Sequence, residues 1–231
     1  MLWAQSARCR AWHAASRFKA RAGKHMSASE SQQHWQKAYG ARASDGLSWY
    51  QEKPKVSLAL IAATGIVPPA PIIDMGGGAS NLVDYLIAAG HTDITVLDIA
   101  EASLAAAQQR LGANAEAVSW LTADATDWTP LRRYDIWHDC EVFHFLTQTA
   151  ARRAYVARLE AALAAGGQAI FATFALDGPA RCSGLDVMRY DSASLGCELG
   201  PGFKLAESRA DIHMTPSSMT QKFHYSRFAR S

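Results

Sequence analysis

Five short apolar runs punctuate the chain between residues 71 and 174. They occupy residues 71–75, 94–99, 117–123, 134–139 and 168–174. Near 80–89, 101–111 and 148–165 the apolar positions instead recur at helical spacing, and Gly90, Gly112 and Gly166 stand where such helices would end. Strands that are apolar on both faces and separated by helices predict a parallel sheet covered by helices on both sides.

The chain departs from this pattern at both ends. Residues 29–66 predict a short helix around Trp35 and Tyr39, a turn, and a second helix over 54–63 that begins near Pro54. After residue 200, two strand-like runs are joined by residues 215–218, with no helix between them. These two runs predict an antiparallel hairpin at the edge of the sheet.

Composition supports one globular domain with a basic extension. The 231 residues are 49% hydrophobic and 19% charged, which favours a single domain over 29–231, with a helical lid at 29–66 and a sheet core at 67–231. Residues 1–25 hold six Lys and Arg and no acid. We expect residues 1–28 to be a disordered leader or a start-site extension before Met26, with a transit peptide as the alternative.

Charge, hydropathy and cysteines exclude several classes of protein. Removing the six leader cations from the 23 Lys and Arg leaves 17 against 21 acids, so we expect no nucleic-acid partner. No apolar run reaches the about 18 residues of a membrane span. Cys9, Cys140, Cys182 and Cys197 lack CxxC spacing, which predicts neither a disulfide framework nor a metal site. We therefore expect a cytoplasmic protein, or a mitochondrial one if the leader is a transit peptide.

Three consecutive glycines, Gly76, Gly77 and Gly78, lie between the first run and the first helix. Glycine allows positive φ and a close approach of the backbone to a ligand, although a tight strand-to-helix turn is the alternative explanation. Asn81 stands where a dinucleotide fingerprint would have glycine, and no Gly-Lys-Ser/Thr follows, which excludes a P-loop. Asp74, just before the turn, favours a cationic ligand over a pyrophosphate.

Two further acids end the next two runs. Asp98 follows Asp74 by 24 residues, the spacing at which a carboxylate reaches a ribose diol, and a helix-capping role is the alternative. Asp124 ends the third run, where it could contact an adenine edge. Because ligands of open α/β sheets bind along the carboxyl ends of the strands, the three acids predict one nucleotide site.

These motifs together carry a family resemblance. In order, "IIDMGGGAS", "VLDIA", "TADATDW", "YDIWHDCEVFHFL" and "LAAGGQAIFATF", followed by the hairpin, resemble the class I S-adenosylmethionine-dependent methyltransferases over residues 30–229. The likeness is to small bacterial members and, more distantly, to eukaryotic protein-lysine methyltransferases. It implies an α/β, Rossmann-like, doubly wound, seven-stranded mixed sheet with a C-terminal antiparallel hairpin, and S-adenosyl-L-methionine as cofactor.

The resemblance also assigns cofactor contacts. Gly76–Gly78 would lie under the methionine part, Asp98 would hold the ribose hydroxyls, and Asp124 with Ala125 would flank the adenine. Asp74 and Ile99 are placed in the same site. Cys140 is a departure, since close bacterial look-alikes have arginine there.

Methyl transfer from a sulfonium is an in-line displacement, so the protein mainly aligns donor and acceptor and excludes water. At the end of the fourth run and just beyond it, four polar residues stand where the acceptor would arrive: His138, Asp139, Glu141 and His144. We predict Asp139 as the residue that orients the cofactor amino group or the nucleophile, and His144 as a base. A buried, hydrogen-bonded packing role is the alternative for both histidines.

Two segments are candidates for closing the site. Trp35, Tyr39, Trp49 and Tyr50 could form an aromatic lid over the sulfonium, with Tyr39 and Trp49 as cofactor contacts, although a plain packing helix explains them equally well. The long segment 175–200 is expected to form a wall on the substrate side, with Cys182 and Cys197 as small packing residues.

The sequence leaves the acceptor open. We expect a small-molecule or protein methyl acceptor and a monomer or homodimer. A run of Asn/Asp-Pro-Pro-Tyr/Phe after the fourth strand is missing, which counts against the amino-directed enzymes that carry it. A nicotinamide-dependent oxidoreductase, disfavoured by Asn81, and a non-catalytic S-adenosylmethionine-binding protein are the alternatives.

Overall fold

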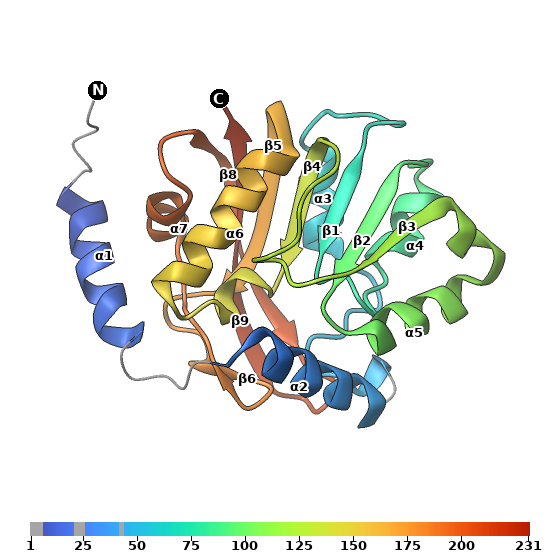
Figure 1. Cartoon of the computed structure of the whole chain (residues 1–231), viewed down its shortest axis with the longest axis horizontal. Helices are drawn as coiled ribbons and strands as arrows, with labels where there is room; N and C mark the ends of the chain where they lie inside the picture. Colours follow the sequence, from blue (N-terminus) through green and yellow to red (C-terminus); the bar gives the residue numbers. More distant parts are fainter. Residues whose placement is uncertain (1–6, 21–25, 42–43) are drawn as a thin grey trace.

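A seven-stranded sheet forms the centre of the molecule in the computed structural model, which describes residues 7–20, 26–41 and 44–231 (Figure 1). The strand order is β3-β2-β1-β4-β5-β9-β8. β9 alone runs in the direction opposite to the other six strands of this sheet, and it lies between β5 and the edge strand β8. The predicted mixed sheet with a terminal hairpin is confirmed. The strands are β1 (Ile72–Met75), β2 (Ile94–Asp98), β3 (Val118–Thr122), β4 (Tyr134–Cys140), β5 (Leu163–Phe174), β8 (Phe203–Met214) and β9 (Thr220–Arg230).

Helices cover both faces because neighbouring strand residues point to opposite sides. Ile136 belongs to the apolar cluster that includes residues of α3 and α4, whereas Trp137 belongs to the cluster that includes residues of α6 and α7. None of the described helices combines the length and the apolar character that a membrane crossing requires. The covering helices are α3 (Lys55–Ala62), α4 (Leu82–Ala88), α5 (Glu101–Leu111), α6 (Thr149–Ala162) and α7 (Ser192–Leu199).

One predicted helix end is wrong. The helix expected over 148–165 stops at Ala162, and β5 begins at Leu163. Gly166, with a φ of 76°, therefore lies within β5 and not at a helix terminus. The register between β4 and β5 shifts between the pairs Tyr134–Leu163 and Ile136–Gln168, so the glycine accommodates an irregularity in the strand. Sheet pairing overrides the helical propensity of the alanine-rich segment.

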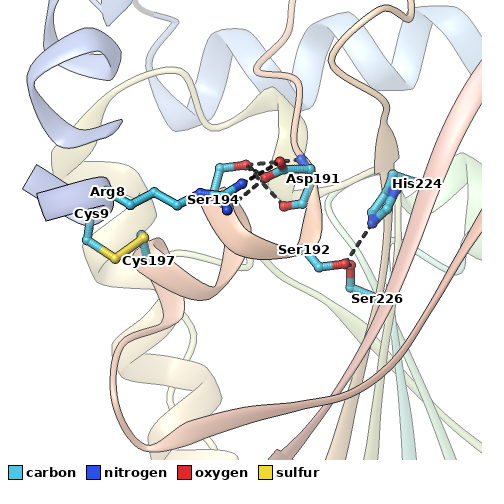
Figure 2. A network of polar contacts seen from close by, with 8 residues as sticks. All are labelled: Arg8, Cys9, Asp191, Ser192, Ser194, Cys197, His224 and Ser226. Carbon is cyan, nitrogen blue, oxygen red and sulfur yellow. Dashed lines mark hydrogen bonds and ion pairs between the residues drawn. A yellow bond between two sulfur atoms is a disulfide. The ribbon is translucent and has the colours of Figure 1, made fainter. Parts of the chain in front are cut away.

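Helix α1 (Ala7–Ala20) occupies much of the segment that the sequence predicts to be disordered. A disulfide joins Cys9 to Cys197 of α7, and Trp12 Nε1 donates a hydrogen bond of 2.8 Å to Glu198 Oε1 (Figure 2 shows the disulfide). Arg8 pairs with Asp191, the N-cap residue of α7, at 3.1 Å. The prediction of a disordered leader is thus wrong for residues 7–20, and residues 1–6 and 21–25 lie outside the described residues.

The prediction that Cys197 is a small packing residue is also wrong, because α1 docks on α7. Cys197 is half of a disulfide and not a free packing residue, and its partner is 188 residues away in the sequence. A separation of this size leaves no spacing motif, because the two cysteines meet only through the docking of α1 on α7.

We expect Cys9→Ser to release α1 without unfolding the domain. The contacts that remain are the solvent-exposed Arg8–Asp191 pair, which contributes little, and those of Trp12 with Glu198 and Tyr190, so we expect the helix to open locally. Trypsin should cleave at the arginines of α1 faster than in the wild type, while Tm falls by less than about 4 °C, the equivalent of roughly 1 kcal/mol. Cys140→Ser is the control. A larger fall in Tm would make α1 part of the cooperative unit, and unchanged cleavage would show that the disulfide does not hold it.

Candidate active site at the carboxyl edge of the sheet

The turn between β1 and α4 needs three glycines because other side chains pack against it. A Cβ on Gly77 would lie 2.3 Å from Asp74 Oδ2, and a Cβ on Gly78 would lie 2.5 Å from Asp98 Oδ2. Gly76 has a φ of 65°, in the left-handed region. The turn therefore packs directly against Asp74 and Asp98, which brings the ends of β1 and β2 together.

A cavity of about 570 Å³ opens at this edge. The carboxyl ends of β1 to β4, the helix α2 (Ala28–Ala41) and the arm made of β6 (Arg181–Cys182) and β7 (Leu185–Asp186) contribute to its lining. The predicted cofactor residues in this lining are Tyr39, Trp49, Gly76, Asp98, Ile99, Asp124 and Ala125. Asp74 and Gly77 line a smaller cavity of about 50 Å³ next to it, and Gly78 lines neither.

The acids at the ends of β2 and β3 are held by local hydrogen bonds. Asp98 Oδ1 accepts from the backbone N–H of Ala100 at 2.8 Å, so the residue also serves the start of α5. Burial raises the pKa of Asp98 to about 6. Asp124 Oδ1 accepts from the backbone N–H of Thr126 at 2.8 Å and from its hydroxyl at 2.7 Å. Both carboxylates are thereby oriented before any ligand binds.

Aromatic residues of α2 and of the segment after it line the cavity, as the lid hypothesis requires. Trp35 packs edge-on against Phe145 at 5.0 Å between ring centroids and against Trp49 at 5.7 Å. The ring centroids of Tyr39 and Trp49 are 5.8 Å apart. Burial, with the nearby carboxylate of Asp98, raises the pKa of Tyr39 well above its usual value. These rings give the cavity an electron-rich wall suited to a cation.

Helix α2 is capped at its start and joined to the domain at its middle. Ser27 and Glu30 form reciprocal side-chain to backbone hydrogen bonds of 2.8 and 3.2 Å that cap its first turn. Gln36 Oε1 accepts from the backbone N–H of Ala102 at the start of α5, at 3.2 Å. Helix α2 therefore contacts the same terminus of α5 that Asp98 supports.

Asp139 lies beneath the cavity and not in its wall. It is fully buried, and its carboxylate accepts from the backbone N–H groups of Val142 at 2.9 Å and Phe143 at 3.1 Å, and from the hydroxyl of Tyr155. Tyr155 in turn accepts from Trp137 Nε1 at 3.0 Å. This network fixes the backbone that follows β4, so we assign Asp139 a positioning role where the sequence predicts a catalytic one.

Asp139→Ala is expected to act mainly on stability. It would leave two backbone donors and a tyrosine hydroxyl buried without an acceptor, each costing about 1–3 kcal/mol. The total should reach at least about 3 kcal/mol, which lowers Tm by roughly 6–12 °C. Asp135→Ala, on the same strand, is the matched control. An unchanged Tm combined with lost turnover would restore the catalytic assignment.

His138 and His144 have buried packing positions. His138 Nδ1 lies 2.6 Å from Asp74 Oδ1 and its Nε2 lies 2.9 Å from Ser57 Oγ, so the pair anchors the acid under the glycine turn. His144 is fully buried, its Nδ1 accepts a long hydrogen bond of 3.4 Å from Phe174 N–H, and burial lowers its pKa to about 3. His144 does not line the large cavity, so its position does not support the predicted base.

Glu141, the residue directly after β4, faces the cavity. It is only 8% exposed and has a φ of 70°, which is uncommon for a residue other than glycine. Its Oε1 has no hydrogen-bond partner among the described residues, and burial raises its pKa to about 8. The sequence places Glu141 near the acceptor but contains no signal that the strand end rotates its side chain into the cavity. Cys140, beside it, also lines the cavity.

The segment 175–200 contributes to the cavity only in part. It is not a single loop but contains β6, β7 and α7. The β6–β7 arm adds Arg181, Cys182 and Asp186 to the lining, whereas α7 packs against α1 and α6. Arg181 and Asp186 pair across the arm at 3.2 Å. The predicted substrate-side wall is therefore confined to the arm.

Comparison with known proteins agrees with this geometry. Residues 73–169 match the model of a family described as a methyltransferase domain. No curated protein matches the chain in sequence. Among solved structures, one reported for the conversion of a disulfide bond into a thioacetal group during echinomycin biosynthesis has a TM-score of 0.71 at 17% identity, over 87% of this chain and 91% of that one.

Two further structures have the same fold. A methyltransferase from Anabaena variabilis has a TM-score of 0.69 at 13% identity, over 90% of this chain and 97% of that one. The Burkholderia thailandensis 1,6-didemethyltoxoflavin-N1-methyltransferase, with 1,6-didemethyltoxoflavin and S-adenosylhomocysteine bound, has a TM-score of 0.63 at 19% identity, over 100% of this chain and 92% of that one. Residues 73–169 thus match a methyltransferase domain, and the chain as a whole shares the fold of these S-adenosylmethionine-dependent methyltransferase structures.

Proposed function

We propose that this protein binds S-adenosylmethionine in the large cavity and transfers its methyl group to a small-molecule acceptor. The observation that carries the proposal is the meeting of Gly76, Asp98 and Asp124 in one cavity, at the carboxyl ends of β1, β2 and β3. Ligands of open α/β sheets bind at this edge. The Burkholderia structure, which holds S-adenosylhomocysteine together with 1,6-didemethyltoxoflavin, supports an acceptor of small size.

In this proposal each element has one task toward the donor. Asp98 accepts hydrogen bonds from the ribose hydroxyls, Asp124 and Ala125 flank the adenine, and Gly76 lies along the methionine part. Tyr39 and Trp49 cover the sulfonium, whose positive charge suits their rings. Because the sulfonium is already an activated leaving group, alignment and exclusion of water are the main demands on the protein.

The acceptor side is assigned to the remaining polar lining. Glu141, Arg181 and Asp186 line the same cavity but come from the end of β4 and the β6–β7 arm. Asp139 holds the turn that carries Glu141, through the backbone of Val142 and Phe143. We assign these side chains to orienting the acceptor.

Calorimetry and a labelled-methyl assay test the proposal. S-adenosylmethionine and S-adenosylhomocysteine should bind the full chain and NAD should not. If NAD binds and neither sulfur nucleotide does, the proposal is overturned in favour of an oxidoreductase. Radiolabelled methyl groups should then enter the small-molecule pool of a fractionated lysate. Label in the protein pool would make the acceptor a protein, and binding with no transfer to any pool would support a non-catalytic binding protein.

The raised pKa of Asp98 predicts that cofactor binding depends on pH. The ionised carboxylate accepts hydrogen bonds from the ribose hydroxyls more strongly than the protonated form does. A bound nucleotide therefore favours the ionised form and lowers the pKa of Asp98 from about 6. Affinity for S-adenosylhomocysteine should therefore fall as pH drops below 6, and binding near that pH should release protons. Calorimetry in two buffers of different ionisation enthalpy measures this release. Asp98→Asn should abolish it, and release that persists in this variant would assign the proton to another group.

A further inference from the structure

Three buried side chains with metal-binding atoms meet at the wall of the large cavity. Glu141, His144 and Cys182 each offer one ligand atom, and these atoms all lie within 4.8 Å of one another. Glu141 directly follows β4, His144 lies three residues further on in a 3-10 turn (Phe143–Phe145), and Cys182 lies in β6, so two segments far apart in the sequence supply the set. They are 8%, 0% and 4% exposed.

The internal contacts of the cluster leave its polar atoms poorly satisfied. Within the described part of the chain, Glu141 Oε1 and His144 Nε2 are buried without a hydrogen-bond partner. Glu141 Oε2 and Cys182 Sγ are 4.0 Å apart, the limit for a weak hydrogen bond. Buried polar atoms normally have partners, and each exception calls for a cause. A cation between the three residues would satisfy these atoms together.

The donor set and its spacing suit a tetrahedral divalent ion. Carboxylate oxygen, imidazole nitrogen and thiolate sulfur are the ligands of zinc sites, with bonds of about 2.0–2.3 Å that hold neighbouring ligand atoms about 3.3–3.8 Å apart. The observed limit of 4.8 Å requires shifts of about 1 Å or less on each atom. A metal ion bound at His144 Nε2 would move the ring proton to Nδ1. This would break the hydrogen bond that Nδ1 accepts from Phe174 N–H, which at 3.4 Å is already long.

We propose that Glu141, His144 and Cys182 form a three-ligand site for Zn²⁺ or a similar divalent ion. Glu141 and Cys182 line the cavity and His144 stands behind them, so the fourth coordination position faces the cavity. An ion with three protein ligands and one open position is the arrangement of zinc sites that bind a substrate or water. A role for this open position in holding an atom of the methyl acceptor rests on the proposed function. The metal site itself does not.

Cobalt titration of the full chain, without any nucleotide, tests the site. Co²⁺ should bind with one equivalent and show the near-ultraviolet thiolate-to-cobalt absorption, and Zn²⁺ should abolish this absorption by displacing it. Cys182→Ser should remove the absorption, and Glu141→Gln should weaken Co²⁺ binding by at least roughly 10- to 100-fold, the loss already seen when outer-shell partners are removed. Cys140→Ser is the matched control, because Cys140 lines the same cavity outside the cluster and should leave the absorption unchanged.

The outcomes separate the metal site from the methyl donor site. Absence of the thiolate absorption in the wild type, its persistence in Cys182→Ser, or its loss in Cys140→Ser alone would each overturn the inference. Circular dichroism melts show whether the variants remain folded. If Cys182→Ser does not fold, Glu141→Gln supplies a second test of the site. S-adenosylhomocysteine binding, measured without metal, reports on the proposed function independently.

Discussion

Asp98→Ala is expected to weaken S-adenosylmethionine binding by roughly 10- to 100-fold, on the basis of about 1.5–3 kcal/mol for hydrogen bonds to a charged group. Asp98 is 4% exposed and lines the cavity at the end of β2, and no other acid among the described residues occupies that strand end. The variant also loses the acceptor for Ala100 N–H. Calorimetry with S-adenosylmethionine measures this affinity directly.

Two variants separate the two roles of Asp98. Asp98→Asn keeps an oxygen for Ala100 N–H and removes the charge, so it should retain the fold and still lose affinity. Asp93→Ala is the matched control, because Asp93 precedes the opposite end of β2 and its side chain forms an exposed pair with Arg132. If Asp98→Ala binds the nucleotide as tightly as the wild type, the assignment of the ribose contact is wrong.

Gly77→Ala is expected to destabilise the domain by about 1–3 kcal/mol, the usual cost of overpacking. The new Cβ would lie 2.3 Å from Asp74 Oδ2 and 2.9 Å from Val96 Cγ1. The carboxylate cannot easily yield, because His138 holds its other oxygen at 2.6 Å. Relief would therefore come from movement of the turn, which should also reduce cofactor affinity. Thermal unfolding and calorimetry on the same preparation measure both effects.

Two other glycines serve as controls for this variant. Gly77 is not among the glycines with positive φ, so its expected cost is steric. Gly90→Ala introduces the strain of a φ of 89° with no atom within 4 Å of the new Cβ, and Gly46→Ala introduces neither strain nor contact. We expect Gly46→Ala to be neutral. A Gly77→Ala protein as stable as the wild type would show that Asp74 moves freely beneath the turn.

The candidate site was predictable where it depends on strand ends. Asp98 and Asp124 each end an apolar run, and parallel strands bring their carboxyl ends to one edge, so local pattern suffices to place both acids. The two acids at the end of β4, Asp139 within the strand and Glu141 directly after it, were not separable in this way. Asp139 points into the core, whereas Glu141 reaches the cavity through a φ of 70° that no residue pattern signals.

By itself the sequence determined the α/β alternation, the glycine turn and the acids at the ends of β2 and β3, because these follow from short-range periodicity and from the steric freedom of glycine. Only the tertiary structure decided the docking of α1 through Cys9 and Cys197 and the meeting of Glu141 with Cys182. Both depend on contacts between segments far apart in the chain. Such contacts are set by the packing of whole elements, which leaves no spacing signal in the sequence.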